Sequence, residues 1–204
     1  IIPVRGKILN CLKADYDKIF KNDIIRDIIK VLGCGVEVKS RANKELSNFD
    51  LSGLRWSKVV ICTDADVDGF QIRTLILTML YRLTPTLIEE GLVYIAQSPL
   101  FEIITGKKTY FAYNEQEKTQ ILKELEGNRQ KYTLNRSKGL GENEPDMMWL
   151  TTMCPDTRRL IQVTPTDAAE TSAMFDLMLG DNLQGRKEFI AEFGADYLDQ
   201  ADVS

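Results

Sequence analysis

A strand-like segment followed at once by alternating aspartates constrains this chain more than any other feature. Residues 59–63 form an apolar, β-branched run typical of a buried strand. Residues 64–69 then read D-A-D-V-D-G, and apolar residues recur at helical spacing from Phe70 to Leu83. The order strand, acidic segment, helix is typical of an open α/β sheet, in which ligand-binding and catalytic residues lie at the carboxyl ends of the strands. Carboxylates this close repel one another unless a cation lies among them, and an oxygen-only cluster favours magnesium.

Three interpretations of this motif compete with a plain acidic turn, which would need only one aspartate. An EF-hand calcium loop requires Glu at its twelfth position, which here is Leu75, and a helix before it. A phosphatase resembling the haloacid dehalogenases would use Asp64 as nucleophile and Asp66 as acid or base, but that family prefers Thr or Val at Asp68. A site resembling the Toprim type would hold magnesium for cleaving and rejoining a nucleic-acid backbone.

The composition excludes several common classes of site. The chain has 204 residues and no histidine, so it cannot form a Ser-His-Asp triad or a His-ligated zinc site within itself. Its cysteines lack C-x-x-C spacing and are expected to be reduced thiols of an intracellular protein, with Cys62 inside the buried strand. No apolar run approaches the roughly 18 residues of a membrane span, and no signal peptide is recognisable. The start at Ile1, without Met, indicates a piece of a longer protein.

The distribution of charge matters more than the net charge of -4. Arg5, Lys7 and Lys13 form a basic opening, residues 129–138 form a second basic stretch, and the tail from Asp167 is acidic. Binding to phosphate depends on local patches rather than on the average charge. On charge alone, an ordinary mixed surface fits slightly better than a nucleic-acid binder.

The pattern predicts alternating strands and helices. Strands are expected at 3–9, 59–63 and 92–96, and a hairpin at 100–104 and 109–113. Helices are expected at 14–32, 70–83, 85–90, 114–125, 145–153, 167–179 and 183–193, and a surface excursion at 36–54.

A second motif, R-S-K-G-L-G-E at residues 136–142, combines phosphate-directed donors with turn-forming glycines. Alone it is a weak signal, as is R-G-K at residues 5–7. Together with the aspartates, these basic motifs become a specific signal. Arg and Lys side chains can hold a nucleic-acid strand while a metal bound by the aspartates acts on the scissile phosphate.

These motifs together resemble the C-terminal half of the B subunit of bacterial type IIA DNA topoisomerases, the family of DNA gyrase and topoisomerase IV. The resemblance is colinear over nearly the whole chain. It is carried by residues 3–10 (P-V-R-G-K-I-L-N), 63–69, 94–100 (Y-I-A-Q-S-P-L), 138–142, 151–158 (T-T-M-C-P-D-T-R), 167–170 and 186–190.

The resemblance implies an α/β fold of the Toprim type, a Rossmann-like, mainly parallel sheet flanked by helices, with its first strand missing and a helical C-terminal tail. The expected divisions are a Toprim core at 1–113, with the surface insertion at 36–54, and a helix-strand-loop region at 114–142 that ends in K-G-L-G-E. A helical tail at 143–204 would dock on the partner A subunit.

The same resemblance implies the site residues. Asp64 and Asp66 would ligate Mg²⁺, for which Mn²⁺ or Ca²⁺ could substitute, and Asp68 would support them as a third metal-site acid. Lys7 and Lys138 are the implied catalytic lysines, and the nucleophile would be a tyrosine of the A subunit. The implied DNA-binding residues are Arg5, Gly6, Lys7, Asn10, Arg136 and Lys138.

The implied function is the DNA cleavage and religation half-site of an ATP-dependent topoisomerase, acting on duplex DNA in an A2B2 assembly in the cytoplasm, with no membrane contact. ATP would bind only in an N-terminal region of the parent. The family's E-G-D-S-A-G motif is expected upstream of Pro3, so the isolated fragment is expected to be inactive. Phe70-Gln71 replaces the usual Ala-His, Ser137 a common aromatic and Asn143-Glu144 the usual Met-Asn, which indicates a divergent branch. The alternative is a Mg²⁺-dependent phosphatase of the haloacid-dehalogenase type.

Overall fold

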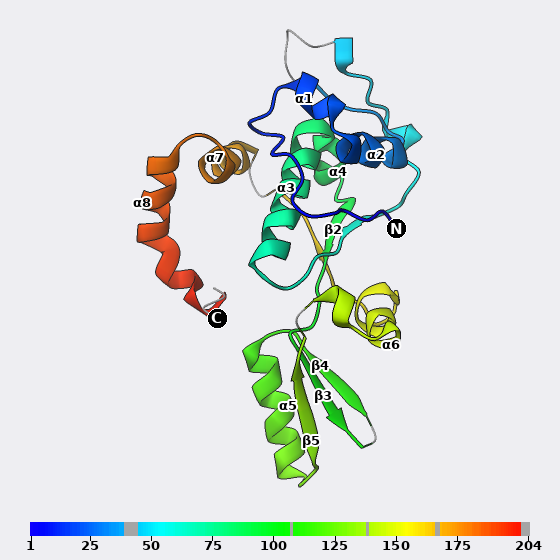
Figure 1. Cartoon of the computed structure of the whole chain (residues 1–204), viewed down its shortest axis with the longest axis vertical. Coiled ribbons are helices and arrows are strands. Elements are labelled where there is room, and N and C mark those ends of the chain that lie inside the picture. The colour runs from blue at the N-terminus through cyan, green and yellow to red at the C-terminus, as the bar shows by residue number, and fades with distance from the viewer. Residues whose placement is uncertain (39–44, 107, 138, 166–167, 201–204) are drawn as a thin grey trace. The chain divides into compact units, whose positions relative to one another are not determined.

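The computed structural model describes residues 1–38, 45–106, 108–137, 139–165 and 168–200 (Figure 1). The chain divides into two compact units that interleave along the sequence. The first unit comprises Ile1–Val59, Gln71–Tyr94 and Gln162–Ser204, and the second comprises Val60–Phe70 and Ile95–Ile161.

Helices and strands alternate along most of the described chain, as the sequence predicts. The α-helices are α1 (Tyr16–Lys21), α2 (Asp23–Leu32), α3 (Val67–Leu83), α4 (Pro85–Glu89), α5 (Glu115–Gly127), α6 (Pro145–Met148), α7 (Ala168–Leu179) and α8 (Leu183–Phe193). The strands are β1 (Val59–Ile61), β2 (Val93–Ala96), β3 (Phe101–Thr105), β4 (Thr109–Ala112), β5 (Tyr132–Arg136) and β6 (Leu160–Gln162). Short turns of other helix types are η2 (Leu51–Gly53), η3 (Leu140–Glu142), the π-helix η4 (Trp149–Met153) and η5 (Gly194–Gln200).

The first unit begins with two helices where the sequence predicted one helix over 14–32. Asn22 is the point of interruption, because its backbone is extended and its side chain accepts a hydrogen bond from the Ile25 N–H at 3.1 Å. Asn22 therefore ends α1 and caps α2, as a short polar side chain favours. Gly33, in the left-handed conformation at φ 83°, ends α2 at the predicted place.

Helix α3 supplies much of the core of the first unit. Leu75, Met79, Leu80 and Leu83 of this helix are all buried. Arg82, in the same helix, donates hydrogen bonds to the carbonyl oxygens of the loop at residues 11–14. A single guanidinium thus satisfies several backbone carbonyl groups of a segment that belongs to no helix or strand.

Three strands form a sheet in the order β1-β2-β6. Strand β6, which the sequence did not predict, runs antiparallel to β2. Two hydrogen bonds fix this direction, from the Val163 N–H to the Val93 oxygen at 2.9 Å and from the Gln97 N–H to the Arg159 oxygen at 3.0 Å. Together with the helices, these strands form an α/β fold, as predicted. The predicted sheet was mainly parallel, whereas β6 runs antiparallel to β2 and the sheet of β3, β4 and β5 is antiparallel.

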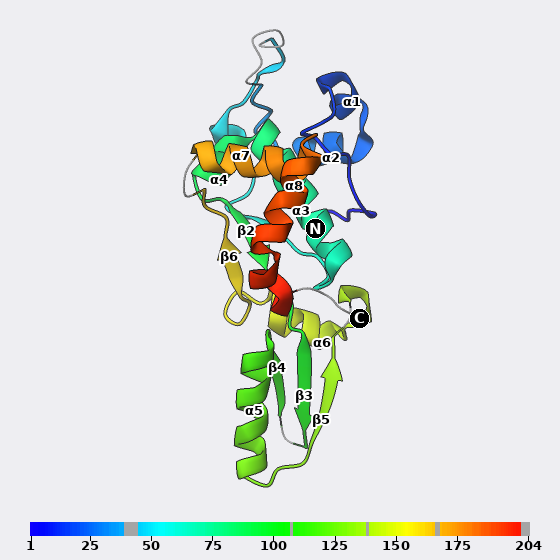
Figure 2. The same cartoon turned by 90° about the vertical axis from the view of Figure 1, so that its left-hand side faces the viewer.

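The second unit contains the predicted hairpin, extended by β5 to an antiparallel sheet in the order β4-β3-β5. Ile103, at the centre of β3, pairs with Tyr110 on one side and Leu134 on the other and is fully buried. Helix α5 packs against β4 (Figure 2). It begins at the predicted cap, where Asn114 accepts a hydrogen bond from the Glu117 N–H at 2.7 Å.

Three further local predictions were wrong. Residues 3–9 form no strand, because Pro3 lacks an N–H and Gly6, at φ 87°, turns the chain. Cys62 is exposed rather than buried, because β1 ends at Ile61. The region at 36–54 is not wholly a surface excursion, since Val36 and Val38 are buried; residues 39–44 of it lie outside the described residues.

The four cysteines are free thiols, as predicted. Within the described residues, no helix combines the length and the apolar character that crossing a membrane requires. The expected division of the chain into a Toprim core ending at 113, a region ending at 142 and a helical tail stays a prediction.

Candidate functional site

The alternating aspartates occupy the connection from β1 to α3, within the second unit. Asp64 and Asp66 are half-buried, whereas Asp68, in the first turn of α3, is exposed. The Asp66 side chain accepts a hydrogen bond from the Gly69 N–H at 2.7 Å, in the manner of a helix N-cap. Asp66 thus satisfies a backbone donor that the start of α3 would otherwise leave without a partner.

Gly69 is required by the tight turn between strand and helix. A Cβ atom at this position would lie 2.1 Å from the carbonyl oxygen of Asp64 and 2.8 Å from its carbonyl carbon. Both atoms are backbone, so they cannot move aside as a flexible side chain could. The final glycine of D-A-D-V-D-G therefore lets the first turn of α3 approach the backbone of Asp64.

The second motif meets the first at Asp64. The Leu140 N–H, in the K-G-L-G-E segment, donates a hydrogen bond to Asp64 Oδ1 at 2.7 Å, across 76 positions of sequence. Gly139 lies beside the same carboxylate, at a position where a Cβ would be 3.5 Å from Oδ2. The two motifs singled out from the sequence are therefore in contact within one unit. Lys138 lies outside the described residues.

The donor chemistry of this segment fits a hard cation such as Mg²⁺, although the aspartates are not gathered into a finished cage. No group of three or more acidic, cysteine or histidine side chains close enough to hold a metal occurs among the described residues. Asp64 and Asp66 each use one carboxylate oxygen for a backbone N–H. A carboxylate can accept about four interactions, so these hydrogen bonds leave capacity for a metal.

The predicted DNA-binding residues are distributed over both units. Arg5, Gly6 and Lys7 are exposed in the first unit, where the Gly6 N–H donates to the Val4 oxygen at 3.2 Å. Asn10 is half-buried, and its side-chain amide donates to the Leu179 oxygen at the end of α7 at 3.1 Å. Arg136 is exposed at the end of β5, in the second unit.

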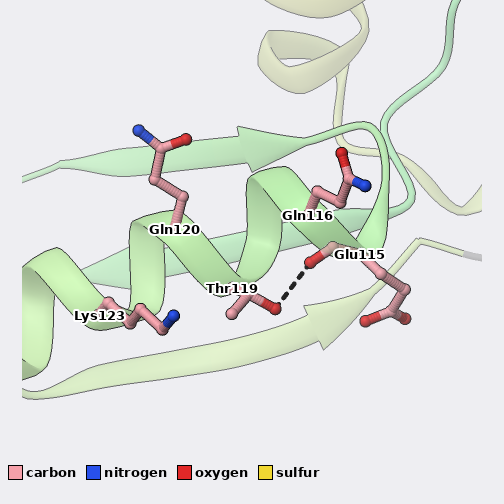
Figure 3. Close-up of a pocket in the computed structure, with 5 residues that line it drawn as sticks. All are labelled: Glu115, Gln116, Thr119, Gln120 and Lys123. Atoms are coloured by element: carbon pink, nitrogen blue, oxygen red, sulfur yellow. Dashed lines mark hydrogen bonds between the residues drawn. The ribbon is translucent and has the colours of Figure 1, made fainter.

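Two surface hollows lie elsewhere. One, of about 420 Å³, is open and lies on α5, with a lining of Glu115, Gln116, Thr119, Gln120 and Lys123 (Figure 3). The other, of about 370 Å³, lies between α3 and α7 and is largely apolar. Neither hollow includes a predicted site residue.

The contribution of the Leu140 amide was missed by sequence reasoning. A backbone N–H carries no signature in the sequence, since every residue except proline has one. The only available signal was the two glycines, Gly139 and Gly141, on either side of Leu140 in K-G-L-G-E.

The sequence was compared with protein families and with known proteins, and both motifs fall in regions that match. The family model of the Toprim domain matches residues 1–98, and that of the carboxyl terminus of the DNA gyrase B subunit matches residues 129–191. The DNA gyrase B subunit of Thermotoga maritima is 43% identical over 190 residues, which is 93% of this chain and 28% of that protein. The corresponding protein of Thermus thermophilus is 46% identical over 192 residues (94% of this chain, 29% of that protein). That of Halalkalibacterium halodurans is 44% identical over 203 residues, 100% of this chain and 30% of that protein.

The strand, the aspartate-rich connection and the first family match define a Toprim protein. With the second match and the relatives that extend along the chain, the assignment becomes narrower: the chain belongs to the DNA gyrase B family. It spans less than a third of the length of these relatives.

Proposed function

We propose that this chain supplies the Toprim half of the DNA-cleavage site of a type IIA topoisomerase. The observation that carries the proposal is the hydrogen bond from Leu140 to Asp64, because it joins the acidic motif to the glycine-rich basic motif. Membership in the DNA gyrase B family supports the same reaction class. A cytoplasmic location would follow from action on bacterial DNA.

Asp64, Asp66 and Asp68 would hold Mg²⁺, or Mn²⁺ or Ca²⁺ in its place. These side chains offer only oxygen ligands, which suits hard divalent cations. When bound, the ion would stabilise the negative charge that develops on the scissile phosphate and on the leaving oxygen. The backbone N–H groups of Gly69 and Leu140 would keep two of these carboxylates in fixed orientations.

The basic residues would hold the DNA backbone on either side of the break. Arg5, Lys7 and Arg136 are exposed and can donate to phosphate oxygens. Lys138 would act in the same way. A tyrosine hydroxyl of the A subunit would attack phosphorus, form a phosphotyrosine bond and release the 3′ oxygen of the neighbouring nucleotide, which takes up a proton. Religation is the reverse of this exchange.

The helical tail would bind the A subunit. Helix α8 has no buried residue, and it exposes Leu183, Ile190 and Phe193 to solvent. Exposed apolar side chains on a helix are typical of a surface that a partner protein covers. The resulting A2B2 assembly would present two cleavage sites to duplex DNA.

The test is DNA cleavage by the protein with its expected upstream E-G-D-S-A-G segment, combined with an A-type subunit, supercoiled DNA and Mg²⁺. We expect Asp66→Asn to lower the yield of protein-linked double-strand breaks, trapped with denaturant, by about 10-fold or more. Asn remains a good helix N-cap, so this change removes the charge and keeps the start of α3. Asp27→Asn, the same change at an exposed position of α2, is the control and should cleave normally. Full cleavage by Asp66→Asn would refute the metal role.

The assay also separates this proposal from the phosphatase alternative. A phosphatase would release phosphate from a small phosphoester without an A subunit or DNA. Turnover of p-nitrophenyl phosphate by this chain alone, abolished by Asp64→Asn, together with an absence of DNA breaks, would favour the phosphatase.

A further inference from the structure

The carboxylate of Asp64 is positioned by backbone atoms from two directions. On one side, Gly69 lets the first turn of α3 lie against the backbone of Asp64. On the other, Leu140 donates its N–H to Oδ1 at 2.7 Å. The N–H group therefore commits Oδ1 to the protein, and a Cβ at Gly139 would lie beside the carboxylate, slightly nearer to Oδ2 (3.5 Å) than to Oδ1 (3.7 Å).

The lack of a side chain at Gly139 is not needed for the backbone of the loop. Its φ of -143° is ordinary extended backbone that any residue adopts. A Cβ would lie 3.5 Å from Oδ2, 3.6 Å from Cγ and 3.7 Å from Oδ1 of Asp64, all ordinary van der Waals distances. A methyl group would therefore fit, but it would cover one side of this carboxylate.

The loop is also anchored independently of Asp64. The Ser137 N–H donates to the Leu100 oxygen at 2.9 Å, and the Ser137 hydroxyl donates to Asn143 Oδ1 at 3.0 Å. These contacts lie on both sides of the turn and link it to the start of β3. A small substitution at Gly139 should therefore leave the loop in place.

We propose that Gly139 and Leu140 form a positioning element for the divalent cation, an inference that rests on the metal role in the proposed function. Leu140 fixes the carboxylate through Oδ1, and the bare Gly139 leaves Oδ2 accessible to the cation. Oxygen ligands held by a second set of hydrogen bonds bind metal more tightly, because less ordering remains to be done on binding. Neither residue contacts the cation itself.

The experiment compares Gly139→Ala with Gly141→Ala in this chain. Gly141 lies in the same loop, has no positive φ, and its added Cβ would meet no heavy atom within 4 Å. The two variants thus make the same chemical change, and only one of them touches Asp64. Free Mn²⁺ is measured by electron paramagnetic resonance during titration, and thermal unfolding by circular dichroism. We expect about 10-fold weaker Mn²⁺ binding for Gly139→Ala, an unchanged affinity for Gly141→Ala, and unchanged unfolding temperatures for both.

A second measurement uses the wild-type chain and needs no substitution at Gly139. The exchange rate of the Leu140 amide with deuterium, measured with and without Mg²⁺, should fall when the cation is present, because the Asp64 carboxylate is then held still. Faster exchange would mean that the cation displaces the Leu140 hydrogen bond, which overturns the inference. Equal Mn²⁺ affinity of Gly139→Ala and the wild type, or equal weakening in Gly141→Ala, would overturn it as well.

The Mn²⁺ titration distinguishes an error in the metal assignment from an error in the role of Gly139. If the wild type binds no Mn²⁺ even when the expected upstream E-G-D-S-A-G segment is present, and Asp64→Ala behaves identically, the metal assignment itself is wrong and the inference falls with it. If the wild type binds Mn²⁺, Asp64→Ala does not, and Gly139→Ala binds normally, the metal site stands and only the role of Gly139 is refuted.

Discussion

At the scale of single residues, a charged cluster joins the start of α5 to the segment before β6. Arg159 donates to Glu117 Oε1 at 2.8 Å, and its guanidinium lies 3.9 Å from the centre of the Tyr113 ring. The Tyr113 N–H donates to the other Glu117 oxygen at 3.2 Å. Partial burial alone would raise the pKa of Glu117, but the hydrogen bonds from Arg159 and Tyr113 outweigh it and lower the pKa below its ordinary value of 4.5.

This shift predicts a pH dependence of stability. Because the pKa of Glu117 is lower in the folded state, its ionised form contributes stability that is complete above the unfolded-state pKa. That contribution is lost as the pH falls below 4.5 and through the folded-state pKa. We therefore expect Glu117→Gln to be less stable than the wild type at about pH 7, with a difference that shrinks in acid. Urea unfolding at several pH values measures it, and a difference that grows below pH 4.5 would contradict the assignment.

The sequence singled out two motifs that the structure brings into contact at Asp64, but it did not indicate how the Asp64 carboxylate is held. The alternating aspartates are recognisable because carboxylates at this spacing are costly without a cation. The hydrogen bond of Leu140 to Asp64 could not be predicted, since it depends on the loop at 137–142 returning to the end of β1. Asn10 shows the opposite case, because its predicted contact with DNA competes with an observed hydrogen bond to Leu179.

At the scale of elements, local signals predicted the second unit well. The hairpin of β3 and β4 follows from strand-forming residues on both sides of a glycine-containing turn, and α5 from a capping residue three positions before Glu117. Residues 3–9 were mistaken for a strand because composition indicates the propensity for extension and not the presence of a neighbouring strand. Strand β6 was missed because it is short and two of its residues are exposed.

The packing of β3 gives a prediction for this sheet. Ile103 is fully buried, whereas the next residue, Ile104, is 37% exposed on the opposite face. We expect Ile103→Ala to lower the free energy of unfolding by about 2–5 kcal/mol, because it removes buried methyl groups and leaves a cavity. Ile104→Ala, the same change in the same strand, should cost roughly 1 kcal/mol or less. Equal losses in urea unfolding would mean that Ile103 is not the core of this sheet.

At the scale of the whole molecule, the division into units could not be predicted from composition. The second unit combines residues 60–70 with residues 95–161, so it joins segments that are distant in sequence. The chain passes from one unit to the other inside helix α3 and inside strands β1, β2 and β6. No change in composition marks these crossing points, because each lies within a continuous element. Motif order indicated the family, whereas the interleaving of the units depends on contacts that only the folded chain contains.

The overall charge of the chain makes the salt dependence of DNA binding informative. With a net charge of -4, the chain can bind DNA only through local basic residues whose charge is not already neutralised by the protein. Arg5 is exposed near the amino terminus, whereas Lys13, in the same basic opening, forms an ion pair with Asp181 at 2.6 Å. If Arg5 contacts a phosphate, Arg5→Gln should reduce the slope of log K against log salt by about 1 and weaken binding equally for different DNA sequences. Lys13→Gln should leave the slope nearly unchanged. Fluorescence anisotropy of a labelled duplex over a series of salt concentrations measures both slopes, and an unaltered slope for Arg5→Gln would remove Arg5 from the DNA-binding surface.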